Sequence, residues 1–174
     1  LLFFEKVQSI YGEEYFAEKE IFESKDLFSH IPYYTPEDKW YRYLRDDFLG
    51  KSKYESLMLD IISDYNFKIE EIKRKLWLTN DHIKKLAEKG HTVGLHSYTH
   101  PTKIQELSKE QQREEYFKNI NHLERLIGKG CVTSMSHPCG EYNETILPLL
   151  DSLGIKIGFR SNMSVRSIKS SLEI

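Results

Sequence analysis

The fold can be inferred from residues 91–101, which have the sequence His-Thr-Val-Gly-Leu-His-Ser-Tyr-Thr-His-Pro. Residues Thr92–Leu95 combine β-branched and apolar side chains, which favours a short strand. A helix through the two later histidines is disfavoured, because Gly94 precedes them and Pro101 restricts the backbone of His100. We therefore predict a strand that ends at Leu95, followed by a tight loop that carries His96 and His100.

Short apolar runs and amphipathic helical patterns alternate outward from this stretch. We predict four strands, at Leu76–Leu78, Thr92–Leu95, Val132–Met135 and Ile155–Phe159. Strands that alternate with helices along a chain are typically parallel and joined by right-handed crossovers. The sequence therefore predicts an α/β fold with parallel strands.

The intervening helices have recognisable starts and ends. Thr79 or Asn80 can cap a helix that ends near Gly90. Ser108 and Gln111 have the spacing of a capping box, and a helix that ends at Gly128 follows. Its apolar face is formed by Tyr116, Ile120, Leu123 and Ile127. Asn143 can cap a further helix ending near Gly154.

Residues 1–75 have a different pattern, with many aromatic and charged residues at helical spacing and few glycines. An apolar face recurs through Tyr54, Leu57, Met58, Ile61, Ile62 and Tyr65. We therefore divide the chain into a helical insertion or lid at residues 1–75 and an α/β part at residues 76–174.

Polar side chains follow two successive strands directly. His96 follows Thr92–Leu95, and His137 comes soon after Val132–Met135. In parallel α/β folds the chemistry gathers at the carboxyl ends of the strands. A loop there can turn His96 and His100 toward one zinc ion, at about 2.0–2.1 Å from each nitrogen. The alternative is that both are ordinary surface histidines on a loop.

Composition excludes some classes of function. The formal net charge of −2 argues against a nucleic-acid-binding surface. No apolar run approaches the roughly 18 residues that a transmembrane helix needs. The two cysteines, Cys131 and Cys139, are too few for a disulfide framework, and we expect free thiols. Localisation stays open between the cytoplasm and the cell envelope.

The segment Lys89–Pro101 resembles the second signature motif of polysaccharide deacetylases of the NodB-homology family, G-H-x-[IVL]-G-x-H-[ST]-x-x-H-P. The resemblance implies part of a distorted (β/α) barrel. It also implies that His96 and His100 are ligands to a divalent metal, usually zinc, and that His91 is not a ligand.

Residues 136–143, Ser-His-Pro-Cys-Gly-Glu-Tyr-Asn, resemble the third motif of that family, R-x-P-[YFW]-G. Ser136 stands where the family has an arginine that orients the catalytic base, and Cys139 stands where it has an aromatic residue. The resemblance implies that the backbone N–H of Cys139 contributes to the oxyanion site, because a backbone donor survives a side-chain change.

The family's first motif, T-F-D-D-G, supplies a catalytic base and a metal-binding aspartate, and we expect it upstream of Leu1. Asp46 and Asp47 are the one aspartate pair in the chain, but their surroundings predict a solvated helix face. No histidine follows His137 to match the family's general acid. Catalytic base and acid are therefore expected outside this chain. Two histidines alone predict weak metal binding and an incomplete site.

The predicted function is metal-dependent hydrolysis of acetyl groups from a sugar polymer or glycan, with zinc as the expected metal. Such an activity is typical of bacterial surface-polysaccharide metabolism, and the expected partner is an acetylated carbohydrate. One alternative is a degenerate relative that binds carbohydrate or a partner without catalysis, as the substitutions at Ser136 and Cys139 suggest. Another is a helical interaction module with incidental histidines.

Overall fold

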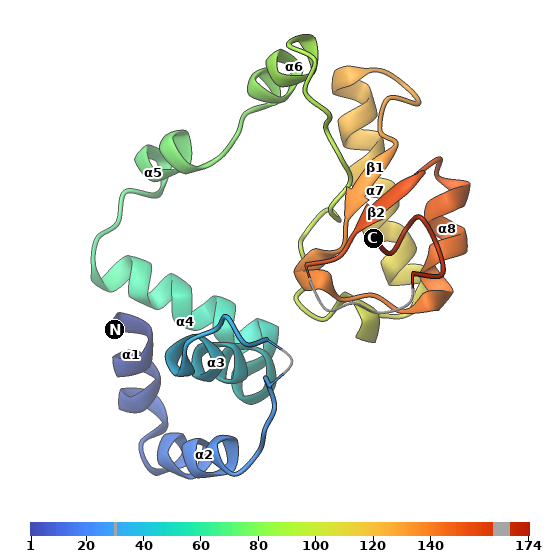
Figure 1. The fold of residues 1–174 in the computed structure, drawn as a ribbon. Coiled ribbons are helices and arrows are strands. Elements are labelled where there is room, and N and C mark those ends of the chain that lie inside the picture. The colour runs from blue at the N-terminus through green and yellow to red at the C-terminus, as the bar shows by residue number, and fades with distance from the viewer. Residues whose placement is uncertain (30, 162–167) are drawn as a thin grey trace. The chain divides into compact units, whose positions relative to one another are not determined.

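The structure is a computed structural model that describes residues 1–29, 31–161 and 168–174. The chain folds as two compact units, Leu1–Lys73 and Arg74–Ile174, which are described separately below. The helices and strands of both are labelled in Figure 1.

Unit 1 is helical throughout its regular structure. It contains α1 (Leu2–Tyr11), α2 (Glu13–Glu23), α3 (Pro36–Tyr43), the π-helical η1 (Leu44–Leu49), α4 (Gly50–Asp64) and most of α5 (Ile69–Leu76). Helix α3 begins at a capping box between Thr35 and Asp38, with Pro36 in its first turn, where a missing N–H costs nothing.

Aromatic side chains fill the core of unit 1. Trp40 stacks on Tyr43 with ring centroids 5.6 Å apart, and its indole N–H donates to the hydroxyl of Tyr15 at 3.1 Å. The Tyr43 hydroxyl donates to Glu18, so both large polar aromatics have hydrogen-bond partners when buried. The aromatic residues that the sequence concentrates in this region therefore form a core.

Asp46 and Asp47 lie in the π-helical segment η1, so the helical interpretation is correct, but the expected solvent exposure is wrong for Asp46. The guanidinium of Arg45 donates to both carboxylate oxygens of Asp46 at 2.7 Å. The Asp46 side chain is only 13% exposed, whereas Asp47 is exposed. Asp46 thus belongs to an ion pair within unit 1.

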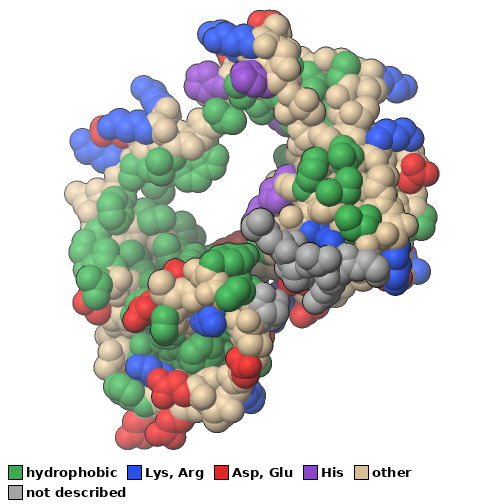
Figure 2. Space-filling model, in the orientation of Figure 1, with side chains coloured by type: hydrophobic (Ala, Val, Ile, Leu, Met, Phe, Trp, Pro, Cys, Tyr) green, Lys and Arg blue, Asp and Glu red, His purple; other side chains and the backbone are tan. Residues whose placement is uncertain are grey.

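The strand predicted at Leu76–Leu78 is wrong. Leu76 ends helix α5, and Leu76, Trp77 and Leu78 are 63–70% exposed. Parallel strands are normally covered on both faces, and a segment this exposed has no such cover. Apolar side chains are also exposed on α4 and α5, where hydrophobic side chains are visible over much of the surface in Figure 2.

Unit 2 contains the predicted helices. Its elements are α6 (Asn80–Glu88), η2 (Ile104–Glu106), α7 (Lys109–Ile127), β1 (Ser134–Ser136), η3 (Pro138–Gly140), η4 (Glu144–Ile146), α8 (Leu147–Ser152) and β2 (Ile157–Phe159). Thr79 caps α6 and Ser108 caps α7, each through a complete capping box. These two predicted caps are confirmed. The third is wrong, because α8 begins at Leu147, and Asn143 precedes the short helix η4 without forming a side-chain cap bond.

A small parallel sheet forms the centre of unit 2, which confirms the prediction of an α/β fold with parallel strands. Strands β1 and β2 lie side by side in Figure 1 and pair in parallel, with Met135 opposite Gly158. The predicted strand at Thr92–Leu95 contributes only Leu95, which forms a parallel bridge with Met135. Within β2, the backbone N–H of Gly158 donates to the carbonyl oxygen of Ser171, and the Gly158 carbonyl oxygen accepts from the N–H of Ile174. The last residues of the chain therefore pair with this strand.

Helices α7 and α8 cover one face of this sheet. Leu95 and Met135 are buried against Tyr116 and Ile120 of α7 and Leu150 of α8. Successive side chains of a strand point to opposite faces. Ser134 and Ser136 therefore face away from these helices, on the side of the sheet where His96 contacts Ser136.

Tyr116 carries a buried hydroxyl that finds no hydrogen-bond partner among the described residues. We expect Tyr116→Phe to leave the free energy of unfolding unchanged or raise it by up to about 1 kcal/mol, because an unsatisfied polar group is removed. Urea denaturation followed by circular dichroism measures this. Tyr142→Phe is the control, since that hydroxyl donates to Glu173 at 2.7 Å, and it should cost about 1–2 kcal/mol. A loss in Tyr116→Phe equal to that in the control would contradict the prediction.

Among the residues that the structure describes, none of the helices combines the length and apolar character that crossing a membrane requires.

Candidate functional site

His96 and His100 lie together in the loop that follows Leu95. Their ring centroids are 4.9 Å apart, and the ring planes are tilted by 49°. His96 is half-buried and His100 is exposed. The loop therefore brings the two imidazoles into the same small volume, where a metal ion or a ligand from solvent can reach them.

The ring of His96 is oriented by β1. Its Nδ1 lies 2.7 Å from the backbone carbonyl oxygen of Ser136 and 2.9 Å from the Ser136 hydroxyl. A carbonyl oxygen can only accept, so Nδ1 carries the hydrogen and donates it. In the neutral ring the lone pair is then on Nε2. A metal-binding histidine has this arrangement, in which one ring N–H is fixed by a carbonyl and the other nitrogen is available to the metal.

Helix α7 holds the backbone of the same loop. The Glu115 carboxylate accepts from the backbone N–H groups of Tyr98 at 2.9 Å and Thr99 at 2.7 Å, and from the Thr99 hydroxyl at 2.7 Å. The side-chain carbonyl oxygen of Asn119 accepts from the backbone N–H of His96 at 3.0 Å. Because Glu115 and Asn119 are four residues apart on one helix, they lie on the same face and contact the loop together.

Backbone strain concentrates in the loops of this site. Four non-glycine residues among those described have positive φ, and three of them are Ser97 at 70°, His100 at 55° and Cys139 at 56°. A left-handed backbone costs such residues about 1–2 kcal/mol each, so surrounding contacts must hold it. This concentration marks the two loops as constrained sites.

His96 and His100 fit a metal as two of its ligands. A zinc ion accepts neutral imidazole nitrogens, and the tautomer of His96 leaves Nε2 to bind one. Within the described residues, however, no group of three or more histidine, cysteine, aspartate or glutamate side chains is placed to hold a metal.

His137 follows β1 directly but is buried. Its side chain is 2% exposed, stacks on Tyr142 with ring centroids 4.2 Å apart, and bonds through Nε2 to the carbonyl oxygen of Leu172 at 2.7 Å. Burial lowers the pKa of His137, and the bond to Leu172 opposes this shift less strongly. His137 is thus a neutral, structural group that ties β1 to the end of the chain.

Cys139 lies in the loop after β1, in the left-handed conformation noted above. Its carbonyl oxygen accepts from the Ser161 hydroxyl at 3.2 Å. Glycine favours the conformation of the next residue, because φ at Gly140 is +74° and a Cβ there would lie 2.2 Å from the Ser161 hydroxyl oxygen. The loop therefore has one close-packed conformation. The role of the Cys139 N–H at an oxyanion remains a prediction.

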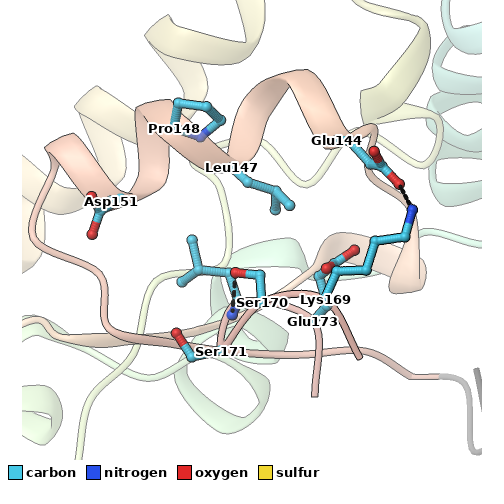
Figure 3. Close-up of a pocket in the computed structure, with 9 residues that line it drawn as sticks. Glu144, Leu147, Pro148, Asp151, Lys169, Ser170, Ser171 and Glu173 are labelled. Atoms are coloured by element: carbon cyan, nitrogen blue, oxygen red, sulfur yellow. Dashed lines mark hydrogen bonds and ion pairs between the residues drawn. The ribbon is translucent and has the colours of Figure 1, made fainter. Parts of the chain in front are cut away.

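A separate pocket of about 450 Å³ lies between α8 and the end of the chain (Figure 3). Glu144 and Lys169 form an ion pair of 2.9 Å at one end of it, and Asp151 lies toward the other end. None of the three predicted site residues lines this pocket.

The sequence predicted the two histidines as site residues but gave no sign that Glu115 and Asn119 would contact their loop. Each stands one position before a buried residue of α7, Tyr116 and Ile120, and is itself only half-buried. A polar residue at the border of an apolar helix face is an ordinary pattern, so this signal is too weak to identify a functional residue. Their roles depend on how the helix packs against the loop.

Comparison with known proteins agrees with the motif evidence. A family model described as polysaccharide deacetylase matches residues 50–158, which is more than half of the chain. Comparison with curated proteins gave no match. Among solved structures, the chain resembles the deacetylase PplD of Streptococcus pyogenes, determined in complex with acetate, with a TM-score of 0.51 and 20% identity over 80% of this chain and 70% of that one. That likeness concerns the fold alone, whereas the family model covers the segments of both motifs. The resemblance seen in the sequence is thus confirmed, and the chain belongs to the polysaccharide deacetylase family and is a hydrolase of that kind.

Proposed function

We propose that this chain takes part in metal-dependent hydrolysis of acetyl groups from a sugar polymer or glycan, with His96 and His100 as two ligands of the metal. The observation that carries the proposal is the pair of imidazoles 4.9 Å apart, in the loop after Leu95, which bridges to β1. The family match supports the reaction class, and the metal and the surface-polysaccharide role belong to the proposal.

Each residue of the site then has a defined task. Ser136 fixes the tautomer of His96 through a 2.7 Å bond, so that Nε2 presents its lone pair. Glu115 and Asn119 fix the loop that carries both histidines. A bound divalent metal, for which zinc is our choice, would polarise the acetyl carbonyl and its attacking water. The Cys139 N–H is our candidate donor to the developing oxyanion.

The remaining ligand and the catalytic base and acid are proposed to come from groups outside the described residues. Parallel segments in the order Leu95, β1 and β2 support a distorted (β/α) barrel as the complete fold. Residues 1–75 are proposed as a helical insertion or lid, and the substrate as an acetylated carbohydrate rather than nucleic acid.

A non-catalytic relative that binds carbohydrate or a partner is the second candidate. It is favoured by the absence of a three-residue metal-ligand cluster among the described residues and by serine and cysteine at two third-motif positions. Acetate release separates it from the enzyme.

The proposal is tested by titrating the chain with zinc while recording the NMR signals of its imidazole rings. We expect the His96 and His100 signals to shift together, with weak affinity because only two ligands are present. His96→Ala should abolish the shift at His100. His91→Ala is the matched control, since His91 is exposed in the same motif and is not part of the pair.

Acetate release from acetylated glycans by the full-length protein, with and without added zinc, tests the activity. Loss of activity in its His96→Ala variant together with retention in its His91→Ala variant supports the enzyme. Zinc-induced shifts with no acetate release from the unaltered full-length protein would favour the binding relative, and no shift at either ring would overturn the metal site.

A further inference from the structure

We propose that Glu115 and Asn119 of α7 are positioning residues that set the metal affinity of the His96–His100 pair by holding its loop in one conformation. The inference rests on the proposed function, because it assigns the two residues to the same metal site.

The Glu115 carboxylate suits its position because all three groups that it meets can donate. Two are backbone N–H groups, of Tyr98 and Thr99, and the third is the Thr99 hydroxyl. Charge-assisted bonds to an ionised carboxylate are shorter and stronger than neutral ones, and these measure 2.7–2.9 Å. Both amides belong to residues between the two histidines, so Glu115 fixes the centre of the loop.

Asn119 fixes the start of the loop. Its amide oxygen accepts from the N–H of His96 at 3.0 Å, while Ser136 accepts from the ring of the same residue. His96 is thus held at its backbone by α7 and at its ring by β1. Neither contact uses Nε2, which is the atom that the proposed function assigns to the metal.

This clamp accounts for the strained conformation of the loop. Ser97 and His100 both have positive φ, and they flank the two amides that Glu115 binds. Without the clamp, relaxed conformations become accessible in which the two rings no longer face the same volume. Metal binding would then have to order the loop. The apparent metal affinity would equal the intrinsic affinity multiplied by the fraction of chains whose loop is already ordered.

The experiment compares three variants with the unaltered chain by zinc titration of the His96 and His100 ring signals. Glu115→Ala removes all three acceptor contacts, and we expect zinc affinity to fall about 10–100-fold, as for other outer-shell partners of metal ligands. Asn119→Ala should lower it by a smaller factor, since one contact is lost.

Glu114→Ala is the matched control. Glu114 is the neighbouring residue on the same helix, and it pairs with Lys118 at 2.7 Å, with both side chains more than half exposed. The two alanine variants therefore change charge and helix propensity equally. Zinc affinity should be unchanged in Glu114→Ala. Equal losses in both variants would show that charge alone acts, and would overturn the positioning role.

Glu115→Gln separates geometry from charge. Its amide oxygen can still accept from the two backbone N–H groups, and the Thr99 hydroxyl can turn to accept from the amide nitrogen. A positioning role predicts an affinity close to that of the unaltered chain. An effect as large as that of Glu115→Ala would overturn it.

A metal-free measurement gives a second readout. Hydrogen exchange of the Tyr98 and Thr99 amides should accelerate in Glu115→Ala and stay slow in Glu114→Ala, while the amides in the middle of α7 stay protected in both. If exchange and zinc affinity are both unchanged in Glu115→Ala, the positioning role fails and the metal site stands. If zinc moves neither ring in the unaltered chain, the metal site fails, and the proposed role of Glu115 fails with it.

Discussion

Replacing Gly158 by alanine is expected to cost about 2–4 kcal/mol of unfolding free energy, because a side chain there meets backbone. A Cβ at this position would lie 2.4 Å from the carbonyl oxygen of Leu172. Backbone cannot swing away as a flexible side chain can. Relief of the clash would separate β2 from the end of the chain and strain the bonds that Gly158 makes to Ser171 and Ile174.

The same displacement would loosen two further contacts, the His137 bond to Leu172 and the Tyr142 bond to Glu173. A domain of this size is stabilised by only about 5–15 kcal/mol, so the loss is a substantial fraction of the total. Urea denaturation followed by circular dichroism measures it, and hydrogen exchange of the Ile174 amide localises it.

Gly154→Ala is the control for this substitution. Gly154 has φ of +89°, but nothing lies within 4 Å of the position that a Cβ would occupy there. Alanine at this residue should therefore cost only about 1–2 kcal/mol, through backbone strain. The Ile174 amide should stay protected in this variant. If exchange at Ile174 accelerated equally in both variants, the close approach at Gly158 would not be the cause.

Stability is expected to fall as the pH drops below about 6.5, because His137 is buried in its neutral form. The folded pKa of His137 lies below the ordinary value of 6.5, with burial as the largest cause. Between the two pKa values the unfolded chain binds a proton that the folded chain does not. The stabilisation that neutral His137 gives the folded chain is therefore fully present above pH 6.5. It is lost as the pH falls toward the folded pKa, at up to about 1.4 kcal/mol per pH unit.

His137→Gln should remove this part of the pH dependence, since glutamine can still donate to Leu172 but does not titrate. The measurement is a series of urea denaturation curves between pH 7.5 and 5. His91→Gln serves as the control, because His91 is exposed and should leave the slope unchanged. An identical pH slope in the unaltered chain and in His137→Gln would contradict the prediction. Charges facing His137 are Arg160 and His96, which lower its pKa, and Glu173, which raises it.

Local signals predicted the helices of unit 2 well and its strands poorly. The Thr79 and Ser108 capping boxes are formed within three residues of sequence, so neighbouring residues alone specify them. Strands form only when a partner lies alongside. The strand predicted at Val132–Met135 is observed at Ser134–Ser136, where β2 pairs with it. The strand predicted at Leu76–Leu78 does not form, and Leu76 ends a helix instead.

The two motifs carried most of what could be said of function before the structure. They predicted His96, His100 and Cys139 as site residues, and the family match over residues 50–158 confirms the family that they indicated. The matched range also begins at the first residue of α4, upstream of the segment in which the resemblance could be recognised by motif.

The sequence by itself determined the family, the starts of α6 and α7, and the loop that carries the two histidines, because these features depend on residue types at short spacings. Only the tertiary structure decided the tautomer of His96, the clamp by Glu115 and Asn119, and the burial of His137. Each of these joins residues between 16 and 40 positions apart. Such contacts depend on how α7, β1 and the end of the chain pack together, and no local pattern encodes that packing.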